Sequence, residues 1–287
     1  MDTNGKPSRR ALLGTGIAAF AAGGLSPAAR SQQSPRPTRV LFLIGDYYHN
    51  PAMQETAWRK VLGTTGWRLM FAQEPSFITP EVMAGADLYV MGRYATDTQS
   101  VNISLGWSPD KIVEKRPAPE DFMSPQHEEL IAKNVRRGMG LIAMHCAIWN
   151  PKSRLYLDVL GVDKPVMHGP VVTANMYGLN QDHPITKGIP EFSVGIDEVF
   201  DAVMKPGQHV PLYRTRQDAP ARDAIGAWCR QEGEGRVVAL LAGHTTGPYG
   251  TRQFQEIMWR SAHWALKRDI PPAPEDLSPT GSGRSQR

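Results

Sequence analysis

The sequence predicts a single-domain α/β protein with a mostly parallel sheet flanked by helices on both faces. Strand-like apolar runs alternate along the chain with helix-like segments, which is typical of parallel strands joined by crossover helices. The runs at residues 40–44 and 140–144 are apolar without interruption, as expected of strands that are covered on both faces. Residues 39–270 contain no linker and no internal repeat, so we expect one domain with a large core.

Local signals place the individual elements. Gly45-Asp46 ends the first strand, and Ser124-Pro125 supplies the cap and first position of a helix that ends near Gly138. The last helix has one apolar side, made of Phe254, Ile257, Met258, Ala262, Ala265 and Leu266. In chain order we expect strands at 40–44, 67–72, 87–91, 140–144 and 237–243, and helices at 51–62, 80–84, 124–138 and 252–267.

The two ends of the chain read as segments outside this fold. Residues 8–13 contain a twin-arginine pattern, followed by an uncharged stretch at 11–25 and small residues around 26–29. We interpret residues 1–29 as a twin-arginine signal peptide, which predicts a periplasmic or secreted protein with no stable membrane span after cleavage. An N-terminal membrane anchor is the alternative, although the run is shorter than the ~20 residues that a spanning helix needs. Residues 30–38 form a linker, and the Pro-, Ser- and Gly-rich tail at 271–287 is expected to be disordered.

Charge and cysteine content limit the classes of function that the chain can have. The formal net charge is +4, and residues 1–29 carry +2 of it, so the remaining chain is near neutral for its size. No basic run with interleaved aromatic residues is present, and we therefore expect no nucleic-acid partner. No nucleotide cofactor is evident. Cys146 and Cys229 are either two buried thiols or a disulfide.

Histidines follow three of the predicted strands. His49, His145 and His244 each come where a strand ends, and His168 and the pair Asp197-Glu198 lie between the last two. The carboxyl ends of parallel strands share one edge of a sheet, so we expect these side chains to meet in one pocket. This arrangement indicates an enzyme or a metal site.

Imidazole and carboxylate together suit zinc, nickel, iron or manganese. The predicted ligands of one divalent transition metal are His49, His145, His168 and His244, with Glu198 or Asp197 as carboxylate. Without a metal, His145 and His244 can act as general base and acid. The predicted catalytic residues are therefore His145, Glu198 and His244.

Substrate contacts are expected from polar and aromatic residues near the same strand ends. The predicted substrate-binding residues are His49, Asn50, Arg93, Tyr94, Trp149 and Asp197. The long loop at 95–123 is either a lid over this pocket or a surface excursion. Cys146 is a candidate nucleophile, but residues 147–149 have no glycine to allow a sharp, strained turn at that position.

Several motifs together resemble the ThuA-like (trehalose-utilisation) family. They are the segment 178–190, which contains Asp-His-Pro-Ile-Thr, with Phe192 and Asp197-Glu198 behind it, and the segments 140–145, 168–170, 235–238, 243–244 and 264–266. The resemblance spans residues 40–266. It implies a fold like that of the class I glutamine amidotransferases, a flavodoxin-like three-layer arrangement, in which His145 occupies the position of the nucleophilic cysteine. In the loop after the first strand, only His49 and Asn50 match the family pattern.

The resemblance also implies a role in sugar metabolism, especially of disaccharides oxidised at carbon 3. The leading hypothesis is an exported lyase, hydrolase or isomerase of 3-keto-glycosides that uses metal- or histidine-assisted proton abstraction. An upstream sugar oxidoreductase is the expected functional partner. The alternatives are a non-catalytic sugar-binding or accessory protein and a cysteine-dependent amidohydrolase or peptidase.

Overall fold

The computed structural model describes residues 36–46, 48–94, 123–149 and 154–277. The predicted signal peptide, most of the linker, nearly all of the 95–123 loop and the end of the tail lie outside these residues. Within them, no helix is both long enough and apolar enough to cross a membrane.

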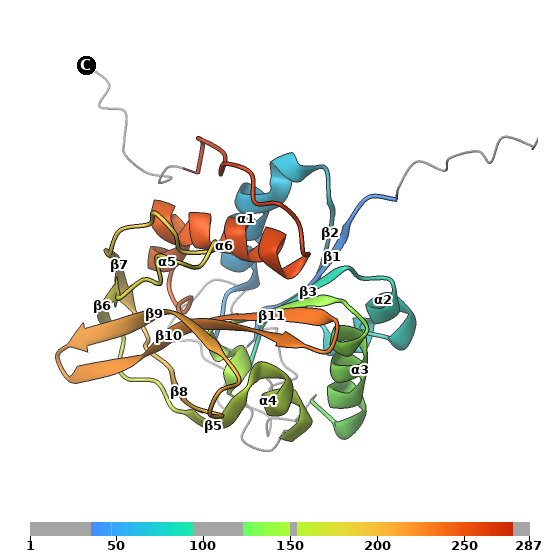
Figure 1. The fold of residues 1–287 in the computed structure, drawn as a ribbon, viewed down its shortest axis with the longest axis horizontal. Helices are drawn as coiled ribbons and strands as arrows, with labels where there is room; N and C mark the ends of the chain where they lie inside the picture. The colour runs from blue at the N-terminus through green and yellow to red at the C-terminus, as the bar shows by residue number, and fades with distance from the viewer. Residues whose placement is uncertain (1–35, 47, 95–122, 150–153, 278–287) are drawn as a thin grey trace, which may run out of the picture. The chain divides into compact units, whose positions relative to one another are not determined.

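The described chain contains a large central sheet with helices on both faces (Figure 1). Nine of its strands form this sheet in the order β2-β1-β3-β4-β11-β10-β9-β6-β7. These strands are β1 (Arg39–Ile44), β2 (Arg68–Ala72), β3 (Leu88–Gly92), β4 (Gly140–Met144), β6 (Val172–Tyr177), β7 (Phe192–Asp197), β9 (Val210–Asp218), β10 (Ala221–Glu232) and β11 (Gly235–Leu240). A separate pair is formed by β5 (Val162–Val166) and β8 (Asp201–Met204).

The sheet is mixed, and our expectation of a mostly parallel sheet was wrong. Strands β2, β1, β3, β4 and β11 are parallel, whereas β11, β10, β9, β6 and β7 pair antiparallel. The connections from β9 to β10 and from β10 to β11 span only residues 219–220 and 233–234, too few for the crossover that a parallel pair needs. The strands that continuous apolar runs did not predict in this sheet are β6, β7, β9 and β10.

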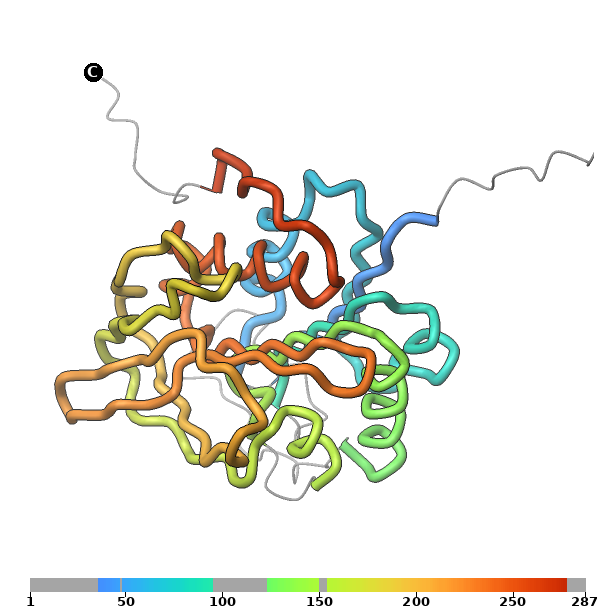
Figure 2. Tube along the Cα trace, in the orientation of Figure 1, coloured from blue at the N-terminus to red at the C-terminus, as the bar shows by residue number. Residues whose placement is uncertain are grey.

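The sheet divides the hydrophobic core into two layers, and helices cover each layer. On one face lie α1 (Pro51–Leu62), α5 (Thr246–Gly250) and α6 (Arg252–Ala265), and on the other lie α2 (Pro80–Ala84), α3 (Pro125–Arg136) and α4 (Arg154–Leu160). Helices α1 and α6 are far apart in sequence but lie side by side, as the trace in Figure 2 shows. The seven expected helix and strand positions from 40 to 144 agree with the structure to within a few residues, and α3 has the expected Ser124 cap.

The first part of the tail is ordered, contrary to our expectation for residues 271–287. Leu277 is fully buried, and the indole N–H of Trp259 donates a 3.0 Å hydrogen bond to the carbonyl oxygen of Pro271. The side chain of Arg252 donates to the carbonyl of Pro274. Prolines cannot continue a helix, but their carbonyls still accept hydrogen bonds, and α6 supplies the donors.

Candidate functional site

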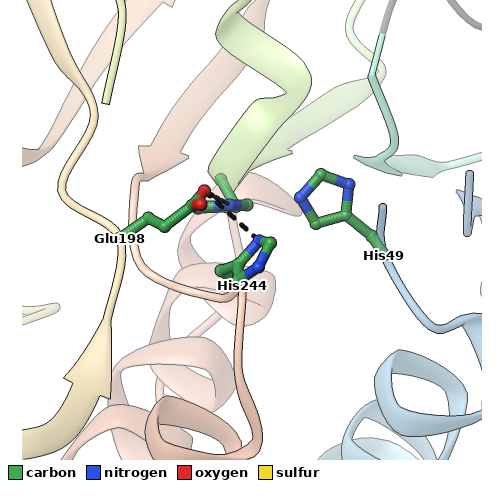
Figure 3. A group of neighbouring side chains, drawn as sticks. His49, Glu198 and His244 are labelled. Atoms are coloured by element: carbon green, nitrogen blue, oxygen red, sulfur yellow. Dashed lines mark ion pairs between the residues drawn. The ribbon is translucent and has the colours of Figure 1, made fainter. Parts of the chain in front are cut away.

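Four side chains from distant segments meet at the carboxyl edge of the sheet. His49 follows β1, His145 follows β4, His244 follows β11, and Glu198 comes directly after β7. The ring centroid of His49 lies 5.0 Å from that of His145 and 5.1 Å from that of His244. Figure 3 shows His49, Glu198 and His244 pointing toward one another. The expected convergence of the three strand-end histidines is therefore present.

Glu198 lies against three histidines. Its Oε2 atom is 3.2 Å from Nδ1 of His244 and 3.5 Å from Nε2 of His145, and its Oε1 atom is 3.3 Å from Nδ1 of His168. One donor atom each from His49, His145, Glu198 and His244 lies within 4.8 Å of the others. We call these four residues the histidine–glutamate cluster.

His168 does not belong to this cluster, although we expected it as a metal ligand. Its Nδ1 atom lies 2.6 Å from the carbonyl oxygen of Gly169, and its side chain is 31 % exposed. It therefore flanks Glu198 at the pocket instead of joining the other three imidazoles.

His145 occupies a sharp turn between β4 and the short 3-10 helix at His145–Ile148. Its φ angle is 48°, in the left-handed region that residues other than glycine rarely adopt. The turn forms without a glycine of its own, contrary to our argument from residues 147–149. Gly243 leaves room for it, because a Cβ atom there would lie 3.4 Å from Cβ of His145 and 2.7 Å from the hydroxyl of Tyr249.

The outer nitrogen atoms of two histidines are held by acceptors. Nδ1 of His145 lies 2.9 Å from the carbonyl oxygen of Leu241, and Nδ1 of His49 lies 2.7 and 2.8 Å from the two carboxylate oxygens of Asp46. Carbonyls and carboxylates only accept, so each Nδ1 carries a proton, and in the neutral ring Nε2 presents the lone pair. Asp46 is fully buried; burial alone would raise its pKa, but His49 and the N–H groups of Tyr94 and Tyr48 lower it to about 2.

Three ring nitrogens in the cluster are buried without a hydrogen-bond partner in the part of the chain that the structure describes: Nε2 of His49, Nε2 of His145 and Nδ1 of His244. Burial lowers the pKa of His145, and it lowers that of His244 to about 4 against the opposing effect of Glu198. The pKa of Glu198 is also lowered, because its three histidine neighbours outweigh the effect of burial. The lowered pKa values of His145, His244 and Glu198 favour two neutral imidazoles beside an ionised carboxylate, which are protonation states that metal ligation requires, so these residues fit a divalent transition metal.

Asp197 braces the loop that carries His244. Its buried carboxylate accepts hydrogen bonds from the backbone N–H groups of Gly243 at 2.8 Å, His244 at 2.9 Å and Thr245 at 3.0 Å. Burial raises its pKa to about 7, and these backbone bonds act in the opposite direction. The carboxylate of Asp197, which we predicted to bind substrate, is bonded inside the fold and does not line the cavity described below.

A cavity of about 280 Å³ opens beside the cluster. Its lining residues are Tyr48, His49, Tyr94, Met167, His168, Glu198, Phe200 and His244. A larger cavity of about 520 Å³, lined in part by Asp201, His209 and Arg214, contains none of the cluster residues. The site is therefore identified by its chemistry and not by the size of the cavity.

Only some of the other predicted substrate-binding residues line the cavity. His49 and Tyr94 line the cavity, whereas Arg93 is fully buried and donates to the carbonyl oxygen of Gly45 at 2.9 Å. Asn50 caps α1 by accepting from Ala52, and Trp149 packs against the hydrophobic core. The sequence reading missed Tyr48, Met167 and Phe200, each of which is a neighbour or near neighbour of a predicted site residue.

Both cysteines are buried free thiols. Cys146 is fully buried, and burial and the carboxylate of Asp46 raise its pKa well above the ordinary value, so a reactive thiolate is disfavoured. Cys229 is also a buried free thiol, which excludes the disulfide alternative. Its sulfur lies 3.3 Å from Nε2 of His183, whose Nδ1 accepts a hydrogen bond from the N–H of Ile185, so His183 shapes its own turn.

Comparison with known proteins places this geometry in a family. The family model described as "ThuA: Trehalose utilisation" matches residues 39–265. No curated protein matches the chain by sequence.

Solved structures share the fold at low identity. A ThuA-like protein from Parabacteroides merdae ATCC 43184 is 17% identical, with a TM-score of 0.62 over 86% of this chain and 96% of that one. A ThuA-like protein from Bacteroides uniformis ATCC 8492 is 15% identical, with a TM-score of 0.61 over 85% of this chain and 97% of that one. The β-galactosidase from Rahnella sp. R3 is 12% identical, with a TM-score of 0.50 over 84% of this chain and 33% of that one. Because the family model covers well over half of its residues, the chain belongs to the ThuA (trehalose utilisation) family, which suggests a carbohydrate-related role.

Proposed function

We propose that this protein is an enzyme that acts on oxidised (3-keto) glycosides or disaccharides and holds one divalent transition metal in the histidine–glutamate cluster. The observation that carries the proposal is the convergence of three buried, unpartnered imidazole nitrogens on one carboxylate. Buried polar atoms almost always have a partner, so three imidazole nitrogens that lack a hydrogen-bond partner among the described residues and gather around one carboxylate favour a bound cation. Nickel, iron, manganese and zinc all accept this mixture of imidazole and carboxylate.

His49, His145 and His244 would hold the metal, and one carboxylate oxygen of Glu198 would complete the set while its other oxygen stays free. When bound, such a metal supplies Lewis-acid stabilisation of negative charge on a carbonyl oxygen. One nitrogen atom of each imidazole is already buried, so little reorganisation is required for binding. The fixed ring orientations of His49 and His145 support the same conclusion.

Glu198 is the residue that the geometry favours as the proton acceptor. One of its oxygens faces the cluster and the other faces His168, so it borders both the cluster and the cavity. A carbonyl at carbon 3 of a sugar acidifies the hydrogen on carbon 2. Removal of this proton by the Glu198 carboxylate leaves the electron pair on the carbonyl oxygen as an enolate. Return of that pair breaks the bond from carbon 1 to its oxygen, and the leaving oxygen takes the proton that Glu198 had accepted. Water then adds to the resulting double bond, with its oxygen on carbon 1 and a hydrogen on carbon 2, and completes a hydrolysis.

The cavity walls suit a sugar ring. Tyr48 and Tyr94 lie with ring centroids 6.1 Å apart, and Phe200 packs edge-on against both His145 and His168. Aromatic faces pack against the axial hydrogens of a sugar while its hydroxyl groups reach polar atoms. We further propose export by the twin-arginine segment at residues 1–29, and an upstream sugar oxidoreductase that supplies the 3-keto substrate.

The test joins metal content with turnover. Protein purified without chelators or a metal-binding tag should contain about one equivalent of transition metal by elemental mass spectrometry, and should consume a 3-keto-glycoside. His145→Ala combined with His244→Ala should lose both the metal and turnover. His127→Gln, on α3, is the matched control and should keep both.

Two outcomes oppose parts of the proposal. Metal binding without turnover on a panel of keto-glycosides would contradict the enzyme and leave a sugar-binding protein. Turnover that persists in the double histidine variant would contradict the site.

A further inference from the structure

Asp46 is the most heavily bonded acid beside the cluster. It lies in the loop after β1 and is fully buried. Besides the two contacts with Nδ1 of His49, its carboxylate accepts from the backbone N–H groups of Tyr48 at 2.8 Å, His49 at 3.1 Å and Tyr94 at 2.7 Å. One carboxylate thus holds the ring of His49 and joins the end of β3 to the loop that carries this ring.

We propose that Asp46 is a positioning residue that fixes His49 in the tautomer with its proton on Nδ1, and thereby makes Nε2 available as a ligand. This inference rests on the metal site of the proposed function. It concerns a residue that does not touch the cavity and that the sequence reading did not select.

The tautomer follows from the chemistry of the two partners. An ionised carboxylate has no proton to donate, so a contact of 2.7 Å to Nδ1 requires the hydrogen to lie on that nitrogen. In the neutral imidazole the lone pair is then on Nε2, which is buried and has no hydrogen-bond partner among the described residues. The opposite tautomer would direct an N–H group at the neighbouring imidazoles, whose centroids are 5.0 and 5.1 Å away.

The backbone bonds make the carboxylate difficult to move. Tyr48 and Tyr94 both line the cavity, and both donate their N–H groups to Asp46. The same residue therefore positions a ligand and two walls of the cavity. A carboxylate that orients a ligating histidine from behind is a common feature of protein metal sites.

Asp46→Asn is the sharpest perturbation, because it preserves shape and replaces one acceptor by a donor. The new amide can donate to Nδ1 of His49, which moves the imidazole proton to Nε2. Cys146→Ala is the matched control: its sulfur lies 3.4 Å from Nδ1 of His49 and 3.7 Å from Asp46, but its removal leaves their hydrogen bond intact.

The first measurement is Co²⁺ affinity by absorption titration of the purified wild-type protein and both variants. We expect Asp46→Asn to bind Co²⁺ about 10- to 100-fold more weakly than wild type, as is typical when such an outer partner is lost. Cys146→Ala should remain within about threefold. A folded Asp46→Asn protein with wild-type affinity would overturn the inference.

The second measurement reads the tautomer directly and does not depend on metal binding. ¹⁵N NMR of histidine-labelled, metal-free wild-type protein should show His49 protonated at Nδ1, and Asp46→Asn should shift the proton to Nε2. Nε2 protonation in wild type would overturn the inference even if the variant does not fold. If wild type has the expected tautomer but binds no Co²⁺, the metal site of the proposed function fails while the tautomer assignment stands.

Discussion

Replacement of Gly243 by alanine tests whether the close packing of Tyr249 and His145 around Gly243 excludes a larger residue at this position. Gly243 has a φ angle of 138°, a conformation open almost only to glycine, and strain there costs about 1–3 kcal/mol. The added Cβ atom would also lie 2.7 Å from the Tyr249 hydroxyl, and such overpacking costs about 1–3 kcal/mol. We therefore expect Gly243→Ala to lower the free energy of unfolding by about 4 kcal/mol, the middle of the combined range.

The matched control is Gly207→Ala. Gly207 also has a positive φ angle, 68°, but nothing lies within 4 Å of its missing Cβ atom. It should lose only about 1–2 kcal/mol, the cost of a left-handed residue. Urea unfolding of both variants measures the difference, and equal losses would refute the close approach.

Tyr249→Phe sharpens the test. It removes the hydroxyl at 2.7 Å and leaves the ring carbon Cζ at 3.2 Å as the nearest tyrosine atom. In a double-mutant cycle, Gly243→Ala should therefore cost less in the Tyr249→Phe background than in wild type. Additive losses would show that the hydroxyl is not the obstacle.

Three further predictions concern the thiol, the metal and pH. Iodoacetamide should leave turnover unchanged, because Cys146 is fully buried and its thiol has a raised pKa. If iodoacetamide abolishes turnover in wild type but not in Cys146→Ala, the nucleophile hypothesis is restored. Chelation should lower the melting temperature and abolish turnover, and added metal should restore both, since a ligand bound only to the native state stabilises it. Burial lowers the pKa of His263, so as the pH falls the unfolded state takes up a proton before the folded state does. The free energy of unfolding should therefore rise from pH 5 to pH 7. His263→Gln should flatten this slope when it is measured by urea unfolding.

The parallel half of the fold was predictable from local signals. Asn50 and Ser124 stand directly before α1 and α3 and cap them, and the apolar runs of β1 and β4 are fully buried apart from Arg39. The convergence of the strand-end histidines followed from one rule of sheet geometry, because β1, β4 and β11 run in the same direction.

The antiparallel half was not predictable by the same signal. Strand β9 alternates buried and exposed residues over most of its length, and β7 is exposed at half of its positions, so neither contains a continuous apolar run. Their stability depends on pairing with strands that are distant in sequence, such as β6 with β9. Tertiary pairing of this kind is not visible in a local window.

Our predictions of residue roles near the site failed where the direction of the side chain mattered more than its position in the sequence. Arg93 follows the predicted third strand as the histidines follow theirs, yet its guanidinium turns inward to the carbonyls of Gly45 and Gln73. A buried arginine must satisfy its donors, and backbone carbonyls at the strand ends do so here. Sequence position alone cannot distinguish this use from contact with a substrate.

Asp197 and Glu198 show how one acidic pair supplies two functions. Successive side chains at the end of a strand point in opposite directions, so adjacent acids are separated by geometry. Asp197 turns beneath the His244 loop and accepts three backbone N–H groups, while Glu198 turns into the cavity against His145, His168 and His244. The loop that Asp197 holds carries His244, a neighbour of Glu198. We therefore infer that the pair works as a unit, in which one acid positions the imidazole against which the other acts.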